Sequence, residues 1–490
     1  MTLRSHVGVC LATLTAFTGC GVFTAGRSPV QTSSMLLRVN PANPRYFIDG
    51  SGKTVYLAGN IGTNFQDTIW PTDYNQFLND MVSDHQNAFR LWVWEHTRTN
   101  QSAGMGSPMP YQRTGPGIAL DGLPKFDLNK FDQSFFDRLR SAVAAAGSKG
   151  IYVGVMLFQG WSVNNTGSDN PFFGHYFNAQ NNINGINGDV NGDGYAYEVH
   201  SLANSAVTSK QDAYVRKVID TLNDLDNVYW EISNESPPGA TAWQYHMIDL
   251  IHSYEAGKPK QHLVQMSATG WDNSVLFSSP AEIVSPTTAQ FDLTTDPYAS
   301  DPPPVGEGKT LILDGDHVGW KMFKADGLLD ERWVWKAFTR GYNIMDVIAP
   351  ASTAEYYTGG LNDTEIANLK MMTGAVDQTR VYADKMNLIA MTPRGDLTST
   401  GYALANPGWE YLVFAPGGGT FTVNLSGVSG FFLVEWANPV TGATTAGSSI
   451  SGGAQRSLSA PFSGDAALYL KNSGSAYSYQ TPTTDIDELY

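Results

Sequence analysis

Two acidic residues, each at the end of a predicted β-strand, are the strongest candidates for chemistry in this sequence. The run 228–232 is largely apolar and aromatic, and it leads to Asn234-Glu235 just before two prolines. A second apolar run, 310–313, ends in Asp314. A parallel barrel presents its active residues in this way, because the carboxyl ends of all its strands open onto one face. We therefore expect Glu235 and Asp314 to lie on one rim.

Other predicted strand ends and the loops after them carry polar and aromatic side chains that would surround such a pair. We interpret them as substrate-binding residues, except for Asp316, which is a second candidate for the nucleophile. Two carboxylates are what hydrolysis of a glycosidic bond requires, because one acid protonates the leaving oxygen while the other attacks the anomeric carbon. The full set is Asn60, Arg90, Glu95, Gln159, Trp161, Asn234, Trp271, Tyr298, Asp316, His317 and Trp320.

Several of these residues also have a structural explanation. Arg90 can instead form a buried ion pair with Glu95 or Glu231, and this role is compatible with substrate binding. Trp92 and Trp94 share one side of a predicted strand, so one or both can belong to the core. The tryptophans in predicted loops are therefore better candidates for platforms on which a sugar ring stacks.

The chain from residue 35 to residue 379 alternates strand-like and helical runs, which is typical of a parallel α/β fold. The 79 residues from Glu235 to Asp314 allow about 26 for each of three units, which fits a (β/α)8 barrel, where a unit takes about 31 residues. The sixth strand has the weakest pattern and is placed to end near Tyr298. Strands are expected at 54–60, 87–95, 150–159, 227–234, 262–267, 291–293, 310–314 and 343–347, and helices at 131–145 and 209–224.

The pattern changes near residue 380, where short strands separated by turns begin. Such spacing is typical of a β-sandwich. We therefore expect a barrel domain over 35–379, a small β-sandwich domain over 380–472 and a flexible tail over 473–490.

Composition and the N-terminus indicate an exported protein. The formal net charge of −16 argues against a nucleic-acid partner. Residues 1–19 hold an apolar run too short to span a membrane, which is typical of a secretory signal. Residues 18–20 resemble a bacterial lipobox, so we predict a cell-envelope lipoprotein anchored through Cys20, with 20–34 as a tether. Simple secretion is the alternative. Cys10 is the only other cysteine, which excludes a disulfide or thiol site in the mature chain.

One loop has spacing that suits a structural calcium ion. Asp189, Asn191 and Asp193 match the first half of an EF-hand loop. The twelfth position of that loop is His200 instead of Glu, so a polar turn is the alternative reading. No His-Glu-x-x-His motif is present, and we expect no catalytic metal or other cofactor.

These motifs resemble those of the clan of retaining (β/α)8 glycoside hydrolases that includes the family 5 cellulases. The matching residues are Asn234-Glu235, and Arg90 within the run 89–92. The chain is still more similar to a group of bacterial cellulase-like proteins, through the runs 312–317 and 333–336. That group usually ends in a small β-domain labelled collagen-binding. The resemblance covers nearly all of the chain from about residue 37 to residue 470.

The resemblance implies roles for particular residues. Glu235 would be the acid/base at the end of strand four, and Asn234 would bond the sugar hydroxyl next to the reacting carbon. The nucleophile would end strand seven, where the clan has Glu and this chain has Asp314, and Tyr298 would orient it.

Because Asp is one methylene shorter than Glu, alternatives to Asp314 as the nucleophile stay open, namely Asp316, Glu95 and Glu307. The predicted function is double-displacement hydrolysis of a β-linked poly- or oligosaccharide, with carbohydrate as the substrate and the membrane contacted only through the lipid anchor. The alternative is a non-catalytic carbohydrate-binding or adhesin-like surface lipoprotein on a degenerate barrel.

Overall fold

The computed structural model describes residues 34–66, 72–102, 106–165, 167, 169–270, 272–286, 297–306, 308–315, 331–347 and 362–474. Parallel strands close into a barrel in the order β10-β11-β12-β13-β4-β5-β8-β9. The predicted fold, a TIM barrel followed by an all-β region, is confirmed. The barrel strands are β4 (Ala58–Asn64), β5 (Ala88–Trp92), β8 (Tyr152–Gln159), β9 (Val228–Asn234), β10 (Val264–Ser267), β11 (Ile283–Ser285), β12 (Thr310–Asp314) and β13 (Asn343–Val347).

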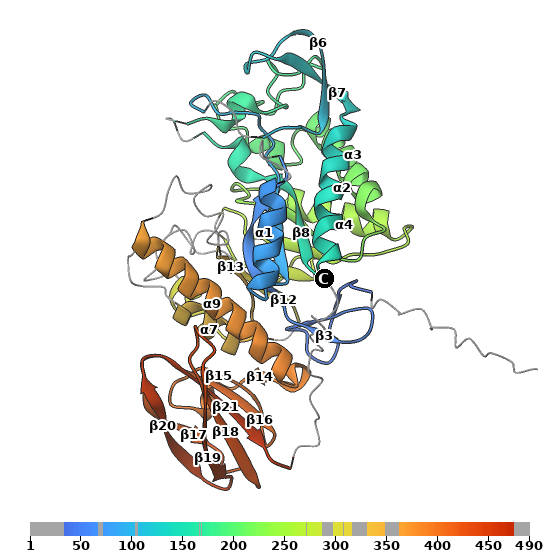
Figure 1. Cartoon of the computed structure of the whole chain (residues 1–490). Helices are drawn as coiled ribbons and strands as arrows, with labels where there is room; N and C mark the ends of the chain where they lie inside the picture. Colours follow the sequence, from blue (N-terminus) through green and yellow to red (C-terminus); the bar gives the residue numbers. More distant parts are fainter. Residues whose placement is uncertain are drawn as a thin grey trace, which may run out of the picture. The chain divides into compact units, whose positions relative to one another are not determined.

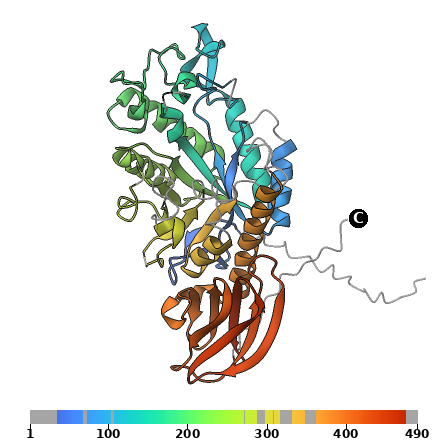
Figure 2. The same cartoon turned by 90° about the vertical axis from the view of Figure 1, so that its left-hand side faces the viewer.

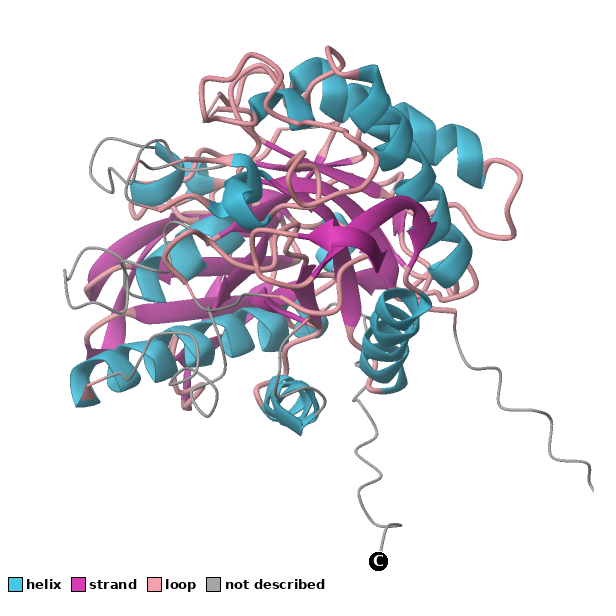
Figure 3. Ribbon diagram, turned by 90° about the horizontal axis from the view of Figure 1, so that it is seen from above, coloured by secondary structure: helices cyan, strands magenta, loops and turns pink. Residues whose placement is uncertain are grey.

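Helices surround the barrel strands (Figure 3). In α2 (Gln133–Ser148), Phe135, Phe136 and Leu139 are buried on one face, as its amphipathic pattern predicts. Asp132 caps this helix by accepting a hydrogen bond from the backbone N–H of Ser134 at 3.0 Å. The other helices are α1 (Thr72–Ser83), α3 (Ser205–Leu222), α4 (Thr241–Glu255), α5 (Pro297–Ser300), α7 (Glu331–Thr339) and α9 (Asp363–Lys385).

Strand alternation divides the barrel side chains between two cores. On β9, Tyr229 joins the interior cluster, whereas Trp230 and Ile232 belong to the larger core that the strands form with the helices. The interior cluster takes side chains from strands all around the barrel, including Ala88, Tyr152, Tyr229, Ile283, Ile312 and Met345. Its packing fixes the strands whose carboxyl ends carry the candidate site.

A small three-stranded sheet packs on the same interior cluster. It consists of β1 (Arg38–Val39), β2 (Phe47–Ile48) and β3 (Thr54–Val55), and its Phe47 and Val55 belong to the cluster. β2 and β3 pair antiparallel and form a hairpin.

Two insertions follow the carboxyl ends of β5 and β8, so they build on the face where Glu235 lies (Figure 1). The first is a hairpin of β6 (Tyr111–Ile118) and β7 (Pro124–Phe131), which the sequence analysis did not predict. The second, residues 160–204, contains the short 3-10 helices η1 (Gly160–Val163), η2 (Pro171–Gly174) and η3 (Tyr197–His200). The two insertions share a hydrophobic cluster that includes Tyr111, Phe126 and Tyr176.

The C-terminal region consists of antiparallel sheets (Figure 2). One sheet has the order β14-β15-β16-β21-β18-β19, and β17 pairs with β20 in a second. Phe421 and Val423 of β17 pack with Tyr411 and Trp436 of the first sheet, which makes a sandwich core. The elements are η5 (Leu388–Ala390), β14 (Thr392–Pro393), η6 (Gly395–Leu397), β15 (Ala403–Asn406), β16 (Glu410–Ala415), β17 (Gly418–Asn424), β18 (Phe431–Ala437), β19 (Thr444–Ser451), β20 (Gln455–Ser463) and β21 (Ala466–Asn472).

The larger C-terminal sheet shares a core with barrel helices. Phe414 of β16 stacks on Trp335 of α7, with ring centroids 5.8 Å apart and an interplanar angle of 19°. Trp335 Nε1 also donates to the carbonyl of Pro439 at 2.8 Å. The boundary expected after residue 379 falls inside α9, which continues to Lys385. The division of the chain into domains stays a prediction.

The sixth strand was placed wrongly. It is β11, Ile283–Ser285, which pairs in parallel with β10 and β12. Tyr298 therefore does not follow the sixth strand directly but lies in α5. A buried strand of only three residues leaves too short a pattern to recognise.

Several predictions concern residues outside the described ranges. They are the signal 1–19, Cys20, the tether as far as residue 33, the run 291–293 predicted as the sixth strand, and the tail from residue 475. No helix in the described part of the chain is long and apolar enough to cross a membrane.

We predict that Phe414→Ala destabilises the barrel as well as the C-terminal sheets, because Phe414 and Trp335 are both fully buried. A buried Phe→Ala change costs about 3–5 kcal/mol. Phe431→Ala is the matched control, since Phe431 is 63% exposed and should change stability by less than about 0.5 kcal/mol. Two measurements check this: urea denaturation gives the free energy of unfolding, and hydrogen exchange gives the protection of the amides in β8 and β9. Unchanged protection of those strands in Phe414→Ala would contradict it.

Candidate active site

Glu235 directly follows the last residue of β9 and has an unusual backbone. Its φ is +46°, and His85 is the only other non-glycine residue with positive φ in the described part of the chain. Gly160, directly after β8, lies against it, since a Cβ on Gly160 would be 1.9 Å from the Glu235 carbonyl oxygen. Strained backbone of this kind persists where the surroundings enforce it. The glycine therefore lets the ends of β8 and β9 meet, and Glu235 remains partly exposed.

A buried ion pair lies just below this strand end. Arg90 of β5 donates from Nε to Glu231 Oε2 at 2.8 Å, and its Nη2 also donates to Glu231 Oε1. Both side chains are completely buried. Of the two partners considered for Arg90, the structure selects Glu231. Arg90 Nη2 donates to Asn234 Oδ1 as well, at 2.8 Å, so the pair also orients the residue before Glu235.

Gln159 closes β8 beside Asn234, and the two residues are paired in the sheet. Gln159 Oε1 accepts from Asn234 Nδ2 at 3.4 Å and from the backbone N–H of Trp161 at 3.2 Å. Four of the predicted site residues, Arg90, Gln159, Asn234 and Glu235, therefore lie together on neighbouring strands.

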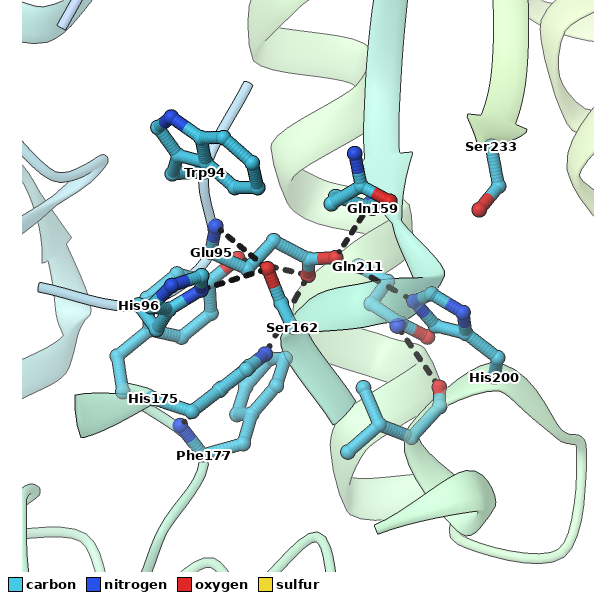
Figure 4. A network of polar contacts seen from close by, with 12 residues as sticks. Trp94, Glu95, His96, Gln159, Ser162, His175, Phe177, His200, Gln211 and Ser233 are labelled. Carbon is cyan, nitrogen blue, oxygen red and sulfur yellow. Dashed lines mark hydrogen bonds and ion pairs between the residues drawn. The ribbon is translucent and has the colours of Figure 1, made fainter. Parts of the chain in front are cut away.

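Glu95 lies in a buried polar network formed with the second insertion (Figure 4). Its side chain is 1% exposed. The carboxylate accepts from the Gln159 backbone N–H at 2.8 Å and from the Tyr176 hydroxyl at 3.1 Å. His200 Nε2 lies 3.3 Å from one oxygen, and His175 Nε2 lies 3.6 Å from the other. The role of Glu95 as a direct sugar ligand stays a prediction, and its surroundings are those of a structural carboxylate.

The protonation states in this network follow from burial and pairing. Burial alone would raise the pKa of Glu95, but its contacts with His175 and His200 outweigh this and hold that pKa well below its usual range. Burial lowers the pKa of His175 despite the nearby Glu95. Burial and the neighbouring His175 lower the pKa of His96 to about 3. Glu95 is therefore charged, and His96 is neutral, at ordinary pH.

An aromatic group stands beside the network. Trp94 packs edge-on against Trp92 and Trp161, with ring centroids 6.0 and 5.6 Å apart. His96 lies 5.2 Å from the Trp161 ring and bonds to Ser162 Oγ at 2.8 Å. All three tryptophans are partly exposed. They are suited to stack on a sugar ring, and this role stays a prediction.

Two other residues that were predicted to bind substrate make contacts within the protein. Asn60 is completely buried, and its Oδ1 accepts from the backbone N–H of Gly62 at 2.9 Å. Tyr298 packs against the barrel–helix core, and its carbonyl accepts from Trp333 Nε1 at 2.9 Å. Neither contact tests a role in binding or in orienting a nucleophile.

Asp314 is the last residue of β12, the seventh barrel strand counted from β4. Its side chain lies outside what the structure describes, as do Trp271, Glu307, Asp316, His317 and Trp320 entirely. The assignment of the nucleophile stays a prediction.

The proposed calcium loop has its carboxylates turned onto its own backbone. Asp189 accepts from the N–H groups of Gly192 and Gly194 at 2.8 and 3.1 Å, and Asp193 accepts from Tyr195 at 2.8 Å. Among the residues that the structure describes, no group of three or more His, Cys, Asp or Glu side chains could hold a metal ion. A calcium ion at Asp189, Asn191 and Asp193 stays a prediction.

Ser162 and Tyr176 had no predicted role, and the contacts of His96 and His200 were not predicted either. Their partners come from segments up to 105 residues apart, so no local spacing links them. The only sequence signal for these contacts is that the segments 93–96 and 160–162 directly follow strands and contain polar residues.

A family described as a domain of unknown function (DUF6298) matches residues 53–280, which include β4, β5, β8, β9 and β10. No curated protein matches the sequence.

Several solved structures share the fold. One described as a glycoside hydrolase is 13% identical, covers 90% of this chain and 98% of its own, and has a TM-score of 0.57. A glycoside hydrolase family 5 protein from Bacteroides vulgatus is also 13% identical, covers 91% of this chain and 95% of its own, and has a TM-score of 0.57. At such identities the likeness concerns the fold alone.

We predict that Arg90→Met lowers the free energy of unfolding by about 3–5 kcal/mol, because it leaves the Glu231 carboxylate buried without its guanidinium partner. The double variant Arg90→Met/Glu231→Met removes both charges and should recover at least half of that loss. Urea denaturation measures both. A double variant less stable than the single one would contradict this account of the pair.

We predict that stability falls as pH decreases from about 6.5 to about 5, in part because of His96. The folded state keeps His96 neutral down to a pKa of about 3, whereas the unfolded chain takes up that proton near pH 6.5. The unfolded state therefore binds more protons in this window, which favours unfolding as pH falls. His96→Phe keeps a ring between the tryptophans and should make the dependence of stability on pH shallower. An unchanged slope would contradict the buried neutral state of His96.

Proposed function

We propose that this chain is a retaining glycoside hydrolase that cleaves a β-linked poly- or oligosaccharide. Glu235 would act as the acid/base and Asp314 as the nucleophile. The observation that carries the proposal is that the fourth and seventh strands of the closed barrel lead to these two acidic residues. Carboxyl ends of barrel strands converge on one face, which is where TIM-barrel enzymes hold their catalytic residues.

In the first step Asp314 would attack the anomeric carbon while Glu235 gives its proton to the leaving oxygen. The bond to the leaving sugar breaks as the ester to Asp314 forms. In the second step Glu235 would take a proton from water, which attacks the same carbon and releases Asp314. Retention of configuration follows, because the carbon is attacked twice from opposite faces.

The residues near Glu235 suit this chemistry. Arg90 donates a hydrogen bond to Asn234 Oδ1. This bond fixes the orientation in which the Asn234 side chain would bind a sugar hydroxyl. Trp161 is the second residue of η1, the turn directly after β8, and its partly exposed ring is a candidate platform. The solved structures with the same fold that are described as glycoside hydrolases support a carbohydrate substrate at the level of the fold.

A second candidate is a carbohydrate-binding protein on a barrel that has lost catalysis. The observation in its favour is that the seventh strand ends in Asp instead of the Glu typical of the resembled clan. This candidate keeps the aromatic group and its polar neighbours as a binding surface and assigns no reaction to Glu235.

We predict that the purified protein hydrolyses at least one substrate in a panel of β-glucans, β-mannans and β-xylans. Glu235→Gln should lower kcat by about 10²–10⁴-fold, because positioned acid–base catalysis contributes that much. Asp314→Asn should lower it at least as far. Asp224→Asn is the control, since the Asp224 side chain is 61% exposed and pairs with Arg140 on the surface.

The outcomes separate the two candidates. Binding of a glycan without turnover by the unchanged protein would favour the non-catalytic one. Full activity in Glu235→Gln would remove the assignment of the acid/base. NMR of the first-formed anomer tests the mechanism, and initial inversion would exclude the double displacement.

A further inference from the structure

Glu95 is a buried carboxylate that is held by four groups from other segments. It lies three residues beyond the end of β5, in the chain that leads to the β6–β7 hairpin. Its two oxygens face Gln159, Tyr176, His175 and His200, which come from the end of β8 and from both halves of the second insertion. In Figure 4, Gln159, His175 and His200 lie around the Glu95 carboxylate on different sides.

Burial of the Glu95 carboxylate costs free energy, and a residue that only binds a sugar would not have to be buried in this way. A carboxylate that is 1% exposed loses its hydration, which destabilises its charged form unless partners replace the water. The two histidines and the Tyr176 hydroxyl supply that replacement. His200 is itself fixed by stacking on Trp243, with ring centroids 4.3 Å apart and an interplanar angle of 8°. Glu95 is therefore held in one place.

The contact that leads from Glu95 to the candidate site is its bond with the Gln159 backbone. Gln159 Oε1 receives hydrogen bonds from Asn234 and Trp161. The next residue, Gly160, lies so close to the Glu235 carbonyl that no side chain would fit between them. A shift of the Gln159 peptide would therefore move the support of both Asn234 and Glu235.

We propose that Glu95 is a positioning residue, which holds the end of β8 against Glu235 through the Gln159 N–H. The kinetic part of this inference rests on the proposed hydrolase function, whereas the structural part does not. Glu95 does not touch the substrate in this account, and it acts through the backbone of Gln159 and Gly160. Glu95 Oε2, which accepts from the Gln159 N–H, is the atom that carries the positioning role.

The chain offers a matched control in Glu255. Its side chain is also 1% exposed and pairs with a buried histidine, His262, at 2.8 Å. It accepts from the His262 backbone N–H at 2.7 Å and from Asn223 Nδ2 at 2.9 Å. Glu255 ends α4, and His262 precedes β10, so this pair belongs to the amino-terminal side of the barrel. It shares burial and chemistry with Glu95 but not the contact with Gln159.

The kinetic test compares Glu95→Leu with Glu255→Leu on the best glycan substrate. Both changes strand buried donors, so both should lower the melting temperature by similar amounts. Glu95→Leu should lower kcat by about 10²-fold, the size of effect expected from a misplacement of about 1 Å, with KM within threefold of the unchanged protein. Glu255→Leu should leave kcat within twofold. Equal effects of the two changes on kcat would overturn the inference.

The conservative variants keep the test decisive if the Leu variants do not fold. Glu95→Gln retains one oxygen that can accept from Gln159, but a neutral acceptor is weaker than a charged one. Its kcat should fall by about tenfold, that is, less than in Glu95→Leu. Glu255→Gln should keep kcat within twofold. Full kcat in Glu95→Gln, together with unchanged amide exchange near Glu235, would overturn the inference.

Amide hydrogen exchange separates this inference from the proposed function. Exchange over 159–161 and 234–236 should be faster in Glu95→Gln than in Glu255→Gln. If the unchanged protein hydrolyses no glycan, the proposed hydrolase function fails, and exchange alone decides the positioning role. Equal exchange in those two segments would then overturn it.

Discussion

The buried ion pair of Arg90 with Glu231 is the constraint on which the candidate site depends. It joins β5 to β9 across β8, on which Gly154 pairs with Arg90 on one side and with Tyr229 on the other. A Cβ on Gly154 would lie 2.5 Å from the Tyr229 ring. Charges with no exposure to water must be paired and hydrogen-bonded. The guanidinium therefore has one position, and from it also fixes Asn234.

A second buried charge is arranged beside the first. Arg90–Glu231 supports the end of β9 from the barrel interior, and Glu95 with its histidines supports the end of β8 from the insertion. The two strand ends meet where Gly160 lies on the Glu235 backbone. Glu235 thus combines a strained φ with a rigid support, which is a common arrangement where a side chain must be held for function. The C-terminal sheets support the barrel from outside the site, because Phe414 of β16 packs on Trp335 of the barrel helix α7.

Most of the fold could be predicted because strand and helix patterns are local. The runs that end in Gln159 and Asn234 are long and almost entirely buried, and each reads as a strand without reference to the rest of the chain. The strand Ile283–Ser285 was missed because three residues carry too little pattern. The hairpin after β5 was also missed, although Asp121-Gly122 between two strands is a recognisable turn signal.

The site could be predicted only in part, for a related reason. Strand ends locate Arg90, Asn234 and Glu235 on one rim, but they do not show that Arg90 pairs with Glu231 and not with Glu95. Nor does any spacing connect Glu95 with His175 and His200, which a long insertion brings back to the barrel. Contacts of that kind depend on tertiary packing, which short motifs do not encode.

The central claim is that Glu235 is the acid/base of a double displacement. The most direct measurement is hydrolysis by Glu235→Ala of an activated aryl β-glycoside whose leaving group needs no proton, with and without added azide. Our account predicts that azide, which needs no general base, restores turnover and gives a glycosyl azide of retained β configuration. No effect of azide in a folded variant, or a product of inverted configuration, would contradict it.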